Sequence, residues 1–161
     1  SVSSGDSKNN EAQAAILYWQ HLFDLPNFTR NQEGIPPNNI LNYGYAVLRG
    51  VAARSLVGSG LLPTLGIFHK NKYNPYCLAD DIMEPYRPFV DSLVCEIIES
   101  GCEFNELTSS LKKQLLRIPT IDVVIDQRKS PLLLAMSRTT NSLYECFSGV
   151  CRKILYPVYV P

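Results

Sequence analysis

Apolar residues recur at the spacing of a helix face along most of this chain. Between about 7 and 23 they fall three and four residues apart, as in an amphipathic helix. Between about 39 and 58 they occur all round the predicted helix, which is typical of a central helix in an all-α domain. Gly44 and Gly50 in this second helix indicate close packing against other helices. The pattern therefore predicts an all-α, mainly helical fold.

Prolines and glycines divide the middle of the chain. Residues 61–75 are expected to form a loop, and a third helix follows at about 76–100. Pro85 and Pro88 should kink or split that helix, because proline lacks an N–H and clashes with the preceding turn. A shorter helix is expected at about 106–116.

The C-terminal third combines one short strand with a long helix. Residues 120–126 are rich in β-branched side chains, which favours a strand, although the sequence offers no obvious partner for it. The last helix is expected to begin at Ser130-Pro131, an N-cap followed by proline at the first helical position. It should continue to about Leu155, before an extended tail at 156–161.

Length and composition are those of an ordinary globular domain. With 161 residues, 45% apolar and 19% charged, the chain is long enough for one domain with a buried core. No apolar run approaches the ~20 residues of a membrane span. The polar start shows no signal peptide. The sequence therefore predicts a cytoplasmic protein without a membrane partner.

Missing motifs exclude several common chemistries. The five cysteines form no CxxC pair, which argues against a disulfide framework and a zinc site and favours buried thiols in a reducing compartment. No Gly-x-Ser-x-Gly elbow supports a serine hydrolase. Neither of the two glycine-rich nucleotide-binding motifs is present.

Charge is balanced overall but unevenly distributed. The formal net charge is zero, so global charge does not indicate nucleic-acid binding. Carboxylates dominate residues 80–106, where Arg87 is the one basic residue, whereas the C-terminal third is basic. Solvated helix faces explain this distribution simply. The alternative is a metal site on one element with phosphate-contacting residues on others.

His69, Asp81 and Glu84 are candidate metal-site residues. Carboxylates suit a hard divalent ion, and imidazole is accepted by Mn²⁺. On a helix Asp81 and Glu84 share a face, and two acids on one face repel unless a cation lies between them. Each residue also has a structural explanation: a lone histidine after an apolar run is often hydrogen-bonded, and Arg87 could pair with Glu84. Glu11, near the start of a predicted helix, is explained equally well by the helix dipole.

Several segments in the same order resemble one known family, the CRISPR adaptation integrase (the Cas-one family), most closely in its type II form. The segments are residues 42–49 (NYGYAVLR), 58–69 (GSGLLPTLGIFH) and 78–88 (LADDIMEPYRP), together with 5–12 (GDSKNNEA) and the predicted C-terminal helix. The resemblance covers nearly the whole chain. It implies that residues 1–161 form the C-terminal helical catalytic domain, with the family's N-terminal β domain absent from this sequence.

The resemblance also implies a site and an activity. Glu11, His69 and Glu84 would be the catalytic ligands of Mg²⁺ or Mn²⁺, and Asp81, the second acid of the motif, would support them. Phosphate contacts would come from Lys70, Lys72, Arg87 and Arg138. The expected reaction inserts protospacer DNA into the CRISPR array, through attack of a 3′-hydroxyl on a phosphodiester at the repeat boundary. The expected partners are double-stranded DNA, a second copy of the chain and the small Cas-two adaptation subunit.

Two alternatives remain open from the sequence. In the first, the chain is a non-catalytic helical interaction module, with a solvated acidic face and a structural His69. In the second, it is a metal-dependent nuclease without integrase activity, because both reactions use the same metal chemistry.

Overall fold

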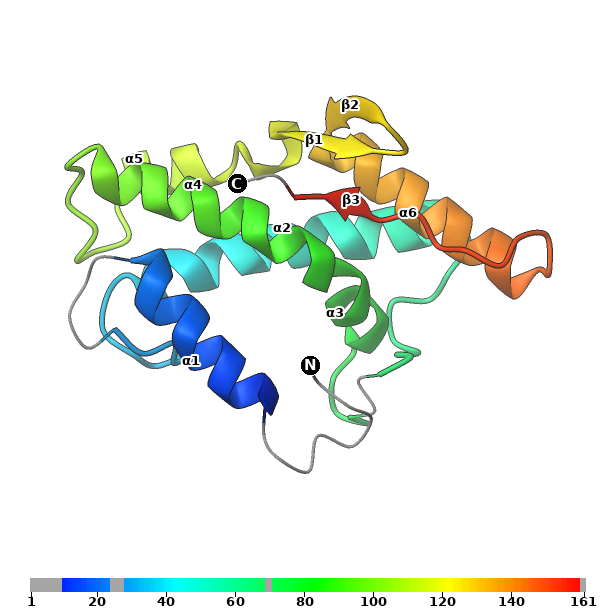
Figure 1. The fold of residues 1–161 in the computed structure, drawn as a ribbon, viewed down its shortest axis with the longest axis horizontal. Helices are drawn as coiled ribbons and strands as arrows, with labels where there is room; N and C mark the ends of the chain where they lie inside the picture. The colour runs from blue at the N-terminus through cyan, green and yellow to red at the C-terminus, as the bar shows by residue number, and fades with distance from the viewer. Residues whose placement is uncertain (1–9, 24–27, 69–70, 160–161) are drawn as a thin grey trace.

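The structure is a computed structural model that describes residues 10–23, 28–68 and 71–159, except for the side chain of Glu11. It is mainly helical, with one small antiparallel sheet at one end (Figure 1). The predicted all-α class with a short hairpin is therefore confirmed. None of the described helices is long and apolar enough to cross a lipid bilayer.

Helix α2 (Asn38–Gly58) is the centre of the fold, as its all-round apolar pattern predicts. It packs against α3 (Cys77–Met83), α4 (Arg87–Glu99), α5 (Ser109–Leu115) and α6 (Leu132–Phe147). Gly44 faces α4 closely, since a Cβ built on it would lie 2.6 Å from Val90 Cγ1. A Cβ on Gly50 would meet nothing within 4 Å. Close packing is thus confirmed at Gly44 and wrong at Gly50, which lies on the exposed side of α2.

The predicted third helix is split at its prolines. Helix α3 ends at Met83, a 3₁₀ turn η1 (Glu84–Tyr86) contains Pro85, and α4 carries Pro88 in its first turn. Both prolines lie in the first turn of a helix, where a backbone N–H would have no acceptor within the helix, so its absence costs little. The break leaves Glu84 at the junction of two helices.

The small sheet supplies the partners that the sequence did not reveal. Strand β1 (Asp122–Ile125) pairs antiparallel with β2 (Arg128–Pro131) on one side and with β3 (Pro157–Val158) on the other. A two-residue turn with positive φ at Asp126 (51°) and Gln127 (59°) joins β1 to β2, as in a tight hairpin. The predicted strand is confirmed, with its buried side chains facing the helices.

Both predicted ends of the last helix are wrong. Ser130 and Pro131 belong to β2, so α6 begins at Leu132 with Pro131 at the N-cap position and no side-chain cap. These residues form a strand because their backbone pairs antiparallel with β1. The helix ends at Phe147, before Gly149 adopts a φ of 75°. Glycine in this left-handed conformation is a common helix terminator.

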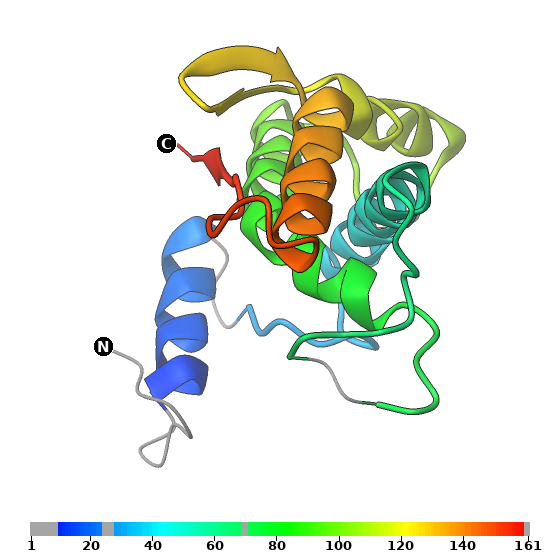
Figure 2. The ribbon, with the colours of Figure 1, turned by 90° about the vertical axis from the view of Figure 1, so that its right-hand side faces the viewer.

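Helix α1 (Asn10–Leu22) lies to one side of the other helices (Figure 2). Its C-terminal end is held by an aromatic cluster in which Trp19, Phe23 and Phe28 contact one another. Nearer the N-terminus of α1, the side chains of Ile16 and Leu17 are 55% and 56% exposed. The aromatic contacts therefore hold the C-terminal end of the helix. The predicted start at residue 7 lies outside the described residues.

The cysteines differ in their burial. All five are free thiols, but Cys77 alone is fully buried and the others are half-buried. Burial raises the pKa of the Cys95 thiol to about 11, which keeps it protonated and unreactive at neutral pH.

The glycine contacts predict opposite effects for two similar substitutions. Gly44→Ala should lower the free energy of unfolding by about 1–3 kcal/mol, because the new methyl group overlaps Val90. Gly50→Ala should raise it by roughly 0.5–1 kcal/mol, since alanine favours a helix and meets open space. Urea denaturation of both variants and the wild type measures this. Equal effects at both positions would contradict the packing described here.

Candidate active site

Of the three predicted ligands, Glu84 is the one whose side chain lies among the described residues. Glu84 is the first residue of η1, and its side chain is 45% exposed. Glu11 lies in the first turn of α1, with its side chain outside the described residues. His69 and Lys70 lie outside the described residues altogether. The convergence of Glu11, His69 and Glu84 therefore stays a prediction.

Asp81 connects α3 to the loop that leads to His69. One carboxylate oxygen, Oδ2, accepts the backbone N–H groups of Ile67 at 2.5 Å and of Phe68 at 2.9 Å. These two residues directly precede His69, and Asp81 lies one helical turn before Glu84. Asp81 therefore fixes the end of this loop next to the helix junction that carries Glu84.

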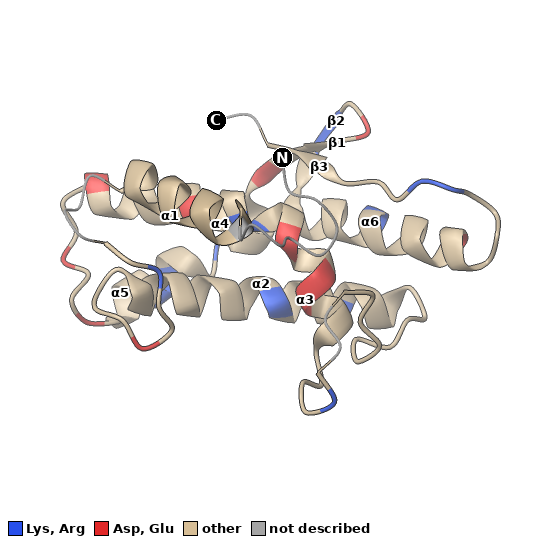
Figure 3. Cartoon of the chain, turned by 60° about the horizontal axis from the view of Figure 1, so that its bottom comes forward, with Lys and Arg blue, Asp and Glu red and all other residues tan. Residues whose placement is uncertain are grey.

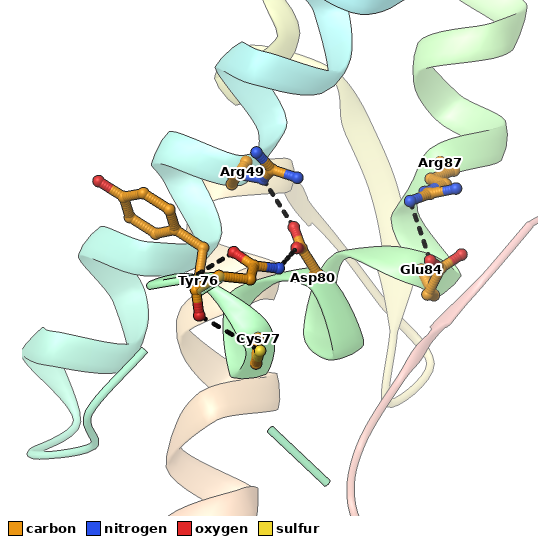
Figure 4. A network of polar contacts seen from close by, with 7 residues as sticks. Arg49, Tyr76, Cys77, Asp80, Glu84 and Arg87 are labelled. Carbon is orange, nitrogen blue, oxygen red and sulfur yellow. Dashed lines mark hydrogen bonds and ion pairs between the residues drawn. The ribbon is translucent and has the colours of Figure 1, made fainter. Parts of the chain in front are cut away.

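Glu84 forms the ion pair with Arg87 that the sequence allowed as an alternative. Oε1 of Glu84 lies 2.9 Å from Nη2 of Arg87, and both side chains are partly exposed (Figure 4). Pairs at such exposed positions contribute only about 0–1 kcal/mol. The ion pair is thus too weak to prevent this carboxylate from binding a divalent ion.

Asp80 has a different role from its neighbour. It is 4% exposed and accepts hydrogen bonds from Arg49 Nε at 2.6 Å and from Asn74 Nδ2 at 2.7 Å (Figure 4). Figure 3 shows the result as a basic position on α2 beside acidic positions on α3. Asp80 therefore joins α3 to α2 and to the 71–76 loop, and does not face the same way as Asp81 and Glu84.

A buried carboxylate that the sequence analysis missed lies behind the site. Asp91 of α4 is 2% exposed and accepts hydrogen bonds from Tyr18 of α1 at 2.7 Å and Tyr45 of α2 at 2.5 Å. Burial raises the pKa of Asp91. Burial of the two tyrosines, together with the nearby Asp91 charge, raises the pKa of Tyr18 and Tyr45 as well. Asp91 thus links three helices through their side chains.

The remaining predicted DNA contacts lie on different elements. Lys72 is exposed in the loop after His69, with its ammonium 4.9 Å from the centre of the Tyr73 ring. Arg138 is half-buried on α6. His21 is exposed on α1, and its Nδ1 lies 2.7 Å from the carbonyl oxygen of Leu17 in the same helix.

Comparison with known proteins decides the family. Residues 7–117 match the family described as CRISPR associated protein Cas1. The chain belongs to this family. The chain is 43% identical over 141 residues to the CRISPR-associated endonuclease Cas1 of Neisseria meningitidis serogroup C, which fits the expected type II form. It is 40% identical over 91 residues to the CRISPR-associated endonuclease Cas1 2 of Pyrobaculum aerophilum.

The chain matches only part of the length of its Cas1 relatives. They cover 88% of the chain but 46% of the Neisseria protein, and 55% of the chain but 31% of the Pyrobaculum protein. The chain therefore spans at most about half the length of the curated relatives it matches. A casposase structure, described as bound to an integration product, superposes with a TM-score of 0.77 at 21% identity. It covers 94% of this chain and 50% of that one, and shows that the two share a fold.

The raised pKa of Asp91 predicts how stability depends on pH. The folded protein holds the Asp91 proton at pH values where the unfolded chain, with a pKa of about 4, has lost it. Its contribution to stability is therefore complete below the unfolded pKa. It falls as pH rises through the raised folded pKa. Asp91→Asn should remove this part of the dependence when urea unfolding is followed from pH 4 to 7.

Asp122→Asn is the matched control for that measurement, because Asp122 is an exposed carboxylate paired with Lys129 at 3.0 Å. This variant should keep the wild-type dependence on pH. If Asp91→Asn also keeps it, burial of the Asp91 charge does not govern stability in this range.

Proposed function

We propose that this chain is the helical catalytic part of a Cas1 integrase. It would be a divalent-metal-dependent enzyme that joins protospacer DNA to a CRISPR repeat by attack of a 3′-hydroxyl on a phosphodiester. The observation that carries the proposal is the Cas1 match over residues 7–117, which span the segments with Glu11, His69 and Glu84. The casposase of similar fold is bound to an integration product, which is why joining of DNA is ranked above plain hydrolysis.

The donor set fits a hard divalent ion. Glu84 offers a partly exposed carboxylate, and its ion pair with Arg87 is weak. Glu11 would add a second carboxylate and His69 an imidazole, a combination that suits Mg²⁺ or, with the nitrogen, Mn²⁺. When bound, the metal supplies a Lewis acid for the phosphoryl oxygen and lowers the pKa of the attacking hydroxyl.

The described residues contribute positioning and charge. Asp81 holds the loop before His69 in place by accepting the backbone N–H groups of Ile67 and Phe68. Arg87 lies one turn after Glu84 and can contact a phosphate close to the reacting one. Lys70, Lys72 and Arg138 would neutralise more distant phosphates, and such contacts supply affinity more than chemistry.

The partners follow from the same proposal. The chain would act on double-stranded protospacer and repeat DNA, together with a second copy of itself and the Cas-two adaptation subunit. The curated relatives are about twice as long as the chain or longer, which is compatible with an additional N-terminal β domain in the complete protein.

Mn²⁺ binding tests the ligand set. A ligand that binds the folded state alone stabilises it, by about 2.7 kcal/mol at a hundred times its dissociation constant. Mn²⁺ should therefore raise the thermal midpoint of the wild type. Glu11→Ala, His69→Ala and Glu84→Ala should each lose most of that shift, whereas Glu145→Ala, an exposed acid on α6, should keep it. If the first three variants all keep the wild-type shift, the ligand assignment is wrong.

Strand transfer and DNA binding by His69→Ala then separate the candidate functions. Loss of transfer with retained binding is the result expected for a metal ligand. Normal integration by this variant would reject the proposed site. Wild-type protein that cuts DNA and yields no joined product would favour the nuclease alternative. Wild-type protein that neither binds Mn²⁺ nor acts on DNA would favour the interaction module.

The Tyr18–Asp91 bond predicts a remote effect on metal binding. Glu11 lies about two turns before Tyr18 on α1, and this bond attaches α1 to α4. Tyr18→Phe should weaken Mn²⁺ affinity about tenfold, the range seen when a support of a metal ligand is lost. Tyr45→Phe removes the other bond to Asp91 without touching α1 and should leave the affinity unchanged. Titration calorimetry with Mn²⁺ compares them, and equal losses would show a general effect of Asp91.

A further inference from the structure

Two thiols lie next to each other where α6 ends. Sγ of Cys146, in the last turn of the helix, is 3.1 Å from Sγ of Cys151, in the segment that follows. This distance is about 1 Å longer than a disulfide bond. The turn between them is at the outer end of α6 (Figure 1), and the side chains of Phe147 and Val150 in it are 62% and 75% exposed. A small oxidant in solution can therefore reach the pair.

The backbone between the two cysteines has an arrangement that ends many helices. Gly149 has a φ of 75°, and its N–H donates to the carbonyl of Cys146 at 3.2 Å. The N–H of Val150 donates to the carbonyl of Glu145 at 2.9 Å. These two bonds and the left-handed glycine form a Schellman motif. The N–H of Cys151 also donates to the carbonyl of Glu145, at 3.4 Å, so a turn hydrogen-bonded to α6 keeps the thiols close.

The segment after this turn is attached to the fold as well. The N–H of Leu155 donates to Oγ of Ser142 on α6 at 2.9 Å, and β3 then pairs with β1. Sγ of Cys151 lies 3.5 Å from the carbonyl oxygens of Ser142 and Lys153, and a thiol is a weak donor. Formation of an S–S bond therefore needs no large movement of the backbone and gives up only weak contacts.

The other three cysteines have different surroundings. Cys77 and Cys95 donate to backbone carbonyl oxygens, and Cys102 accepts a hydrogen bond from a serine hydroxyl. Cys77 is also fully buried. None of these contacts joins two thiols. The fold therefore brings Cys146 and Cys151 together as a pair and keeps the remaining cysteines apart from it.

We propose that Cys146 and Cys151 form a reversible disulfide, with a small disulfide of the glutathione class as the oxidant. This inference does not depend on the proposed function. In a reducing compartment such a bond is transient and responds to the redox state. It closes a short ring across the end of α6 and attaches this helix covalently to the segment that leads to β3.

The reaction consists of two thiol–disulfide exchanges. The Cys151 thiolate attacks one sulfur of the oxidant, breaks its S–S bond and releases one small thiolate. Cys146 then loses its proton to solvent and attacks the Cys151 sulfur of the mixed disulfide, which releases the second small thiolate. Both thiolates take up protons. The oxidant gains two electrons and becomes two thiols, while the protein loses two hydrogen atoms.

The first attack is assigned to Cys151 because Cys146 retains its proton. The hydrogen bond with Cys151 and partial burial raise the pKa of the Cys146 thiol, and the nearby carboxylate of Glu145 acts in the same direction. Cys146 can therefore donate a charge-assisted hydrogen bond to the Cys151 thiolate before the second exchange.

Equilibration with glutathione tests the pair directly. The reduced chain is incubated at several ratios of glutathione disulfide to glutathione, trapped with N-ethylmaleimide under denaturing conditions and digested with trypsin. Both cysteines lie in one tryptic peptide, residues 139–152, because no Lys or Arg lies between Arg138 and Arg152. In the oxidised chain this peptide should carry no maleimide and be lighter by two hydrogen atoms than the reduced, unlabelled peptide.

The same equilibrium in concentrated urea measures what the fold contributes. The equilibrium constant for the bond should be at least about tenfold higher in the native chain, which corresponds to about 30 mV in reduction potential. Because oxidation and unfolding share one thermodynamic cycle, the oxidised chain should resist unfolding by the same factor. Equal constants in native and unfolded protein would overturn the proposal, since the fold would then not place the thiols together.

Serine variants supply the controls. Cys102→Ser should form the bond as the wild type does. Cys146→Ser and Cys151→Ser should instead keep glutathione on the remaining thiol of the peptide, because no second thiol displaces it. Wild-type protein that carries glutathione on this peptide without the internal bond would overturn the proposal. A wild-type peptide that stays labelled on both cysteines at every ratio would overturn it as well.

Discussion

The buried carboxylate of Asp91 is the interaction on which the arrangement of the site depends. Tyr18 from α1 and Tyr45 from α2 both donate to it, so one side chain of α4 fixes two other helices. A buried charge without partners costs several kcal/mol, which makes the cluster intolerant of change. Tyr45 also lies between Arg30 and Arg87. The same cluster therefore positions the helix that carries Glu11 and the Tyr45 ring beside these two arginines.

Helix breaks, rather than long continuous helices, give the site its shape. Pro85 and Pro88 divide what would be one helix into α3, η1 and α4, and Glu84 begins η1. Asp80 and Asp81 lie next to each other on α3 and face different neighbours, Arg49 on one side and the 66–68 loop on the other. Adjacent acids on one helical turn thus tie two separate segments to the same short helix.

The sequence predicts the helices well because each buries an apolar face of regular spacing, and α2 is central for the same reason. The ends of α6 are not predictable in this way, because Ser130-Pro131 serves equally well as a helix start and as strand β2. Only the pairing with β1, a non-local contact, decides between them. One feature of the sequence could have indicated Asp91. It lies on the same helix as the buried Val90, Val94 and Ile97, where an acid needs hydrogen-bond partners. Those partners are 46 and 73 residues away, so spacing could not reveal them.

In the proposed function Arg87 would contact both Glu84 and a DNA phosphate, which would couple metal binding to DNA binding. Its Nη2 pairs with Glu84, its Nε has no hydrogen-bond partner among the described residues, and its guanidinium lies near the Tyr45 ring. A divalent ion on Glu84 would compete with Arg87 for the carboxylate and leave more of the guanidinium charge for a DNA phosphate. A phosphate on Arg87 likewise weakens its hold on Glu84 and favours the ion. Because coupling between two sites is reciprocal, metal and DNA backbone should each strengthen the binding of the other.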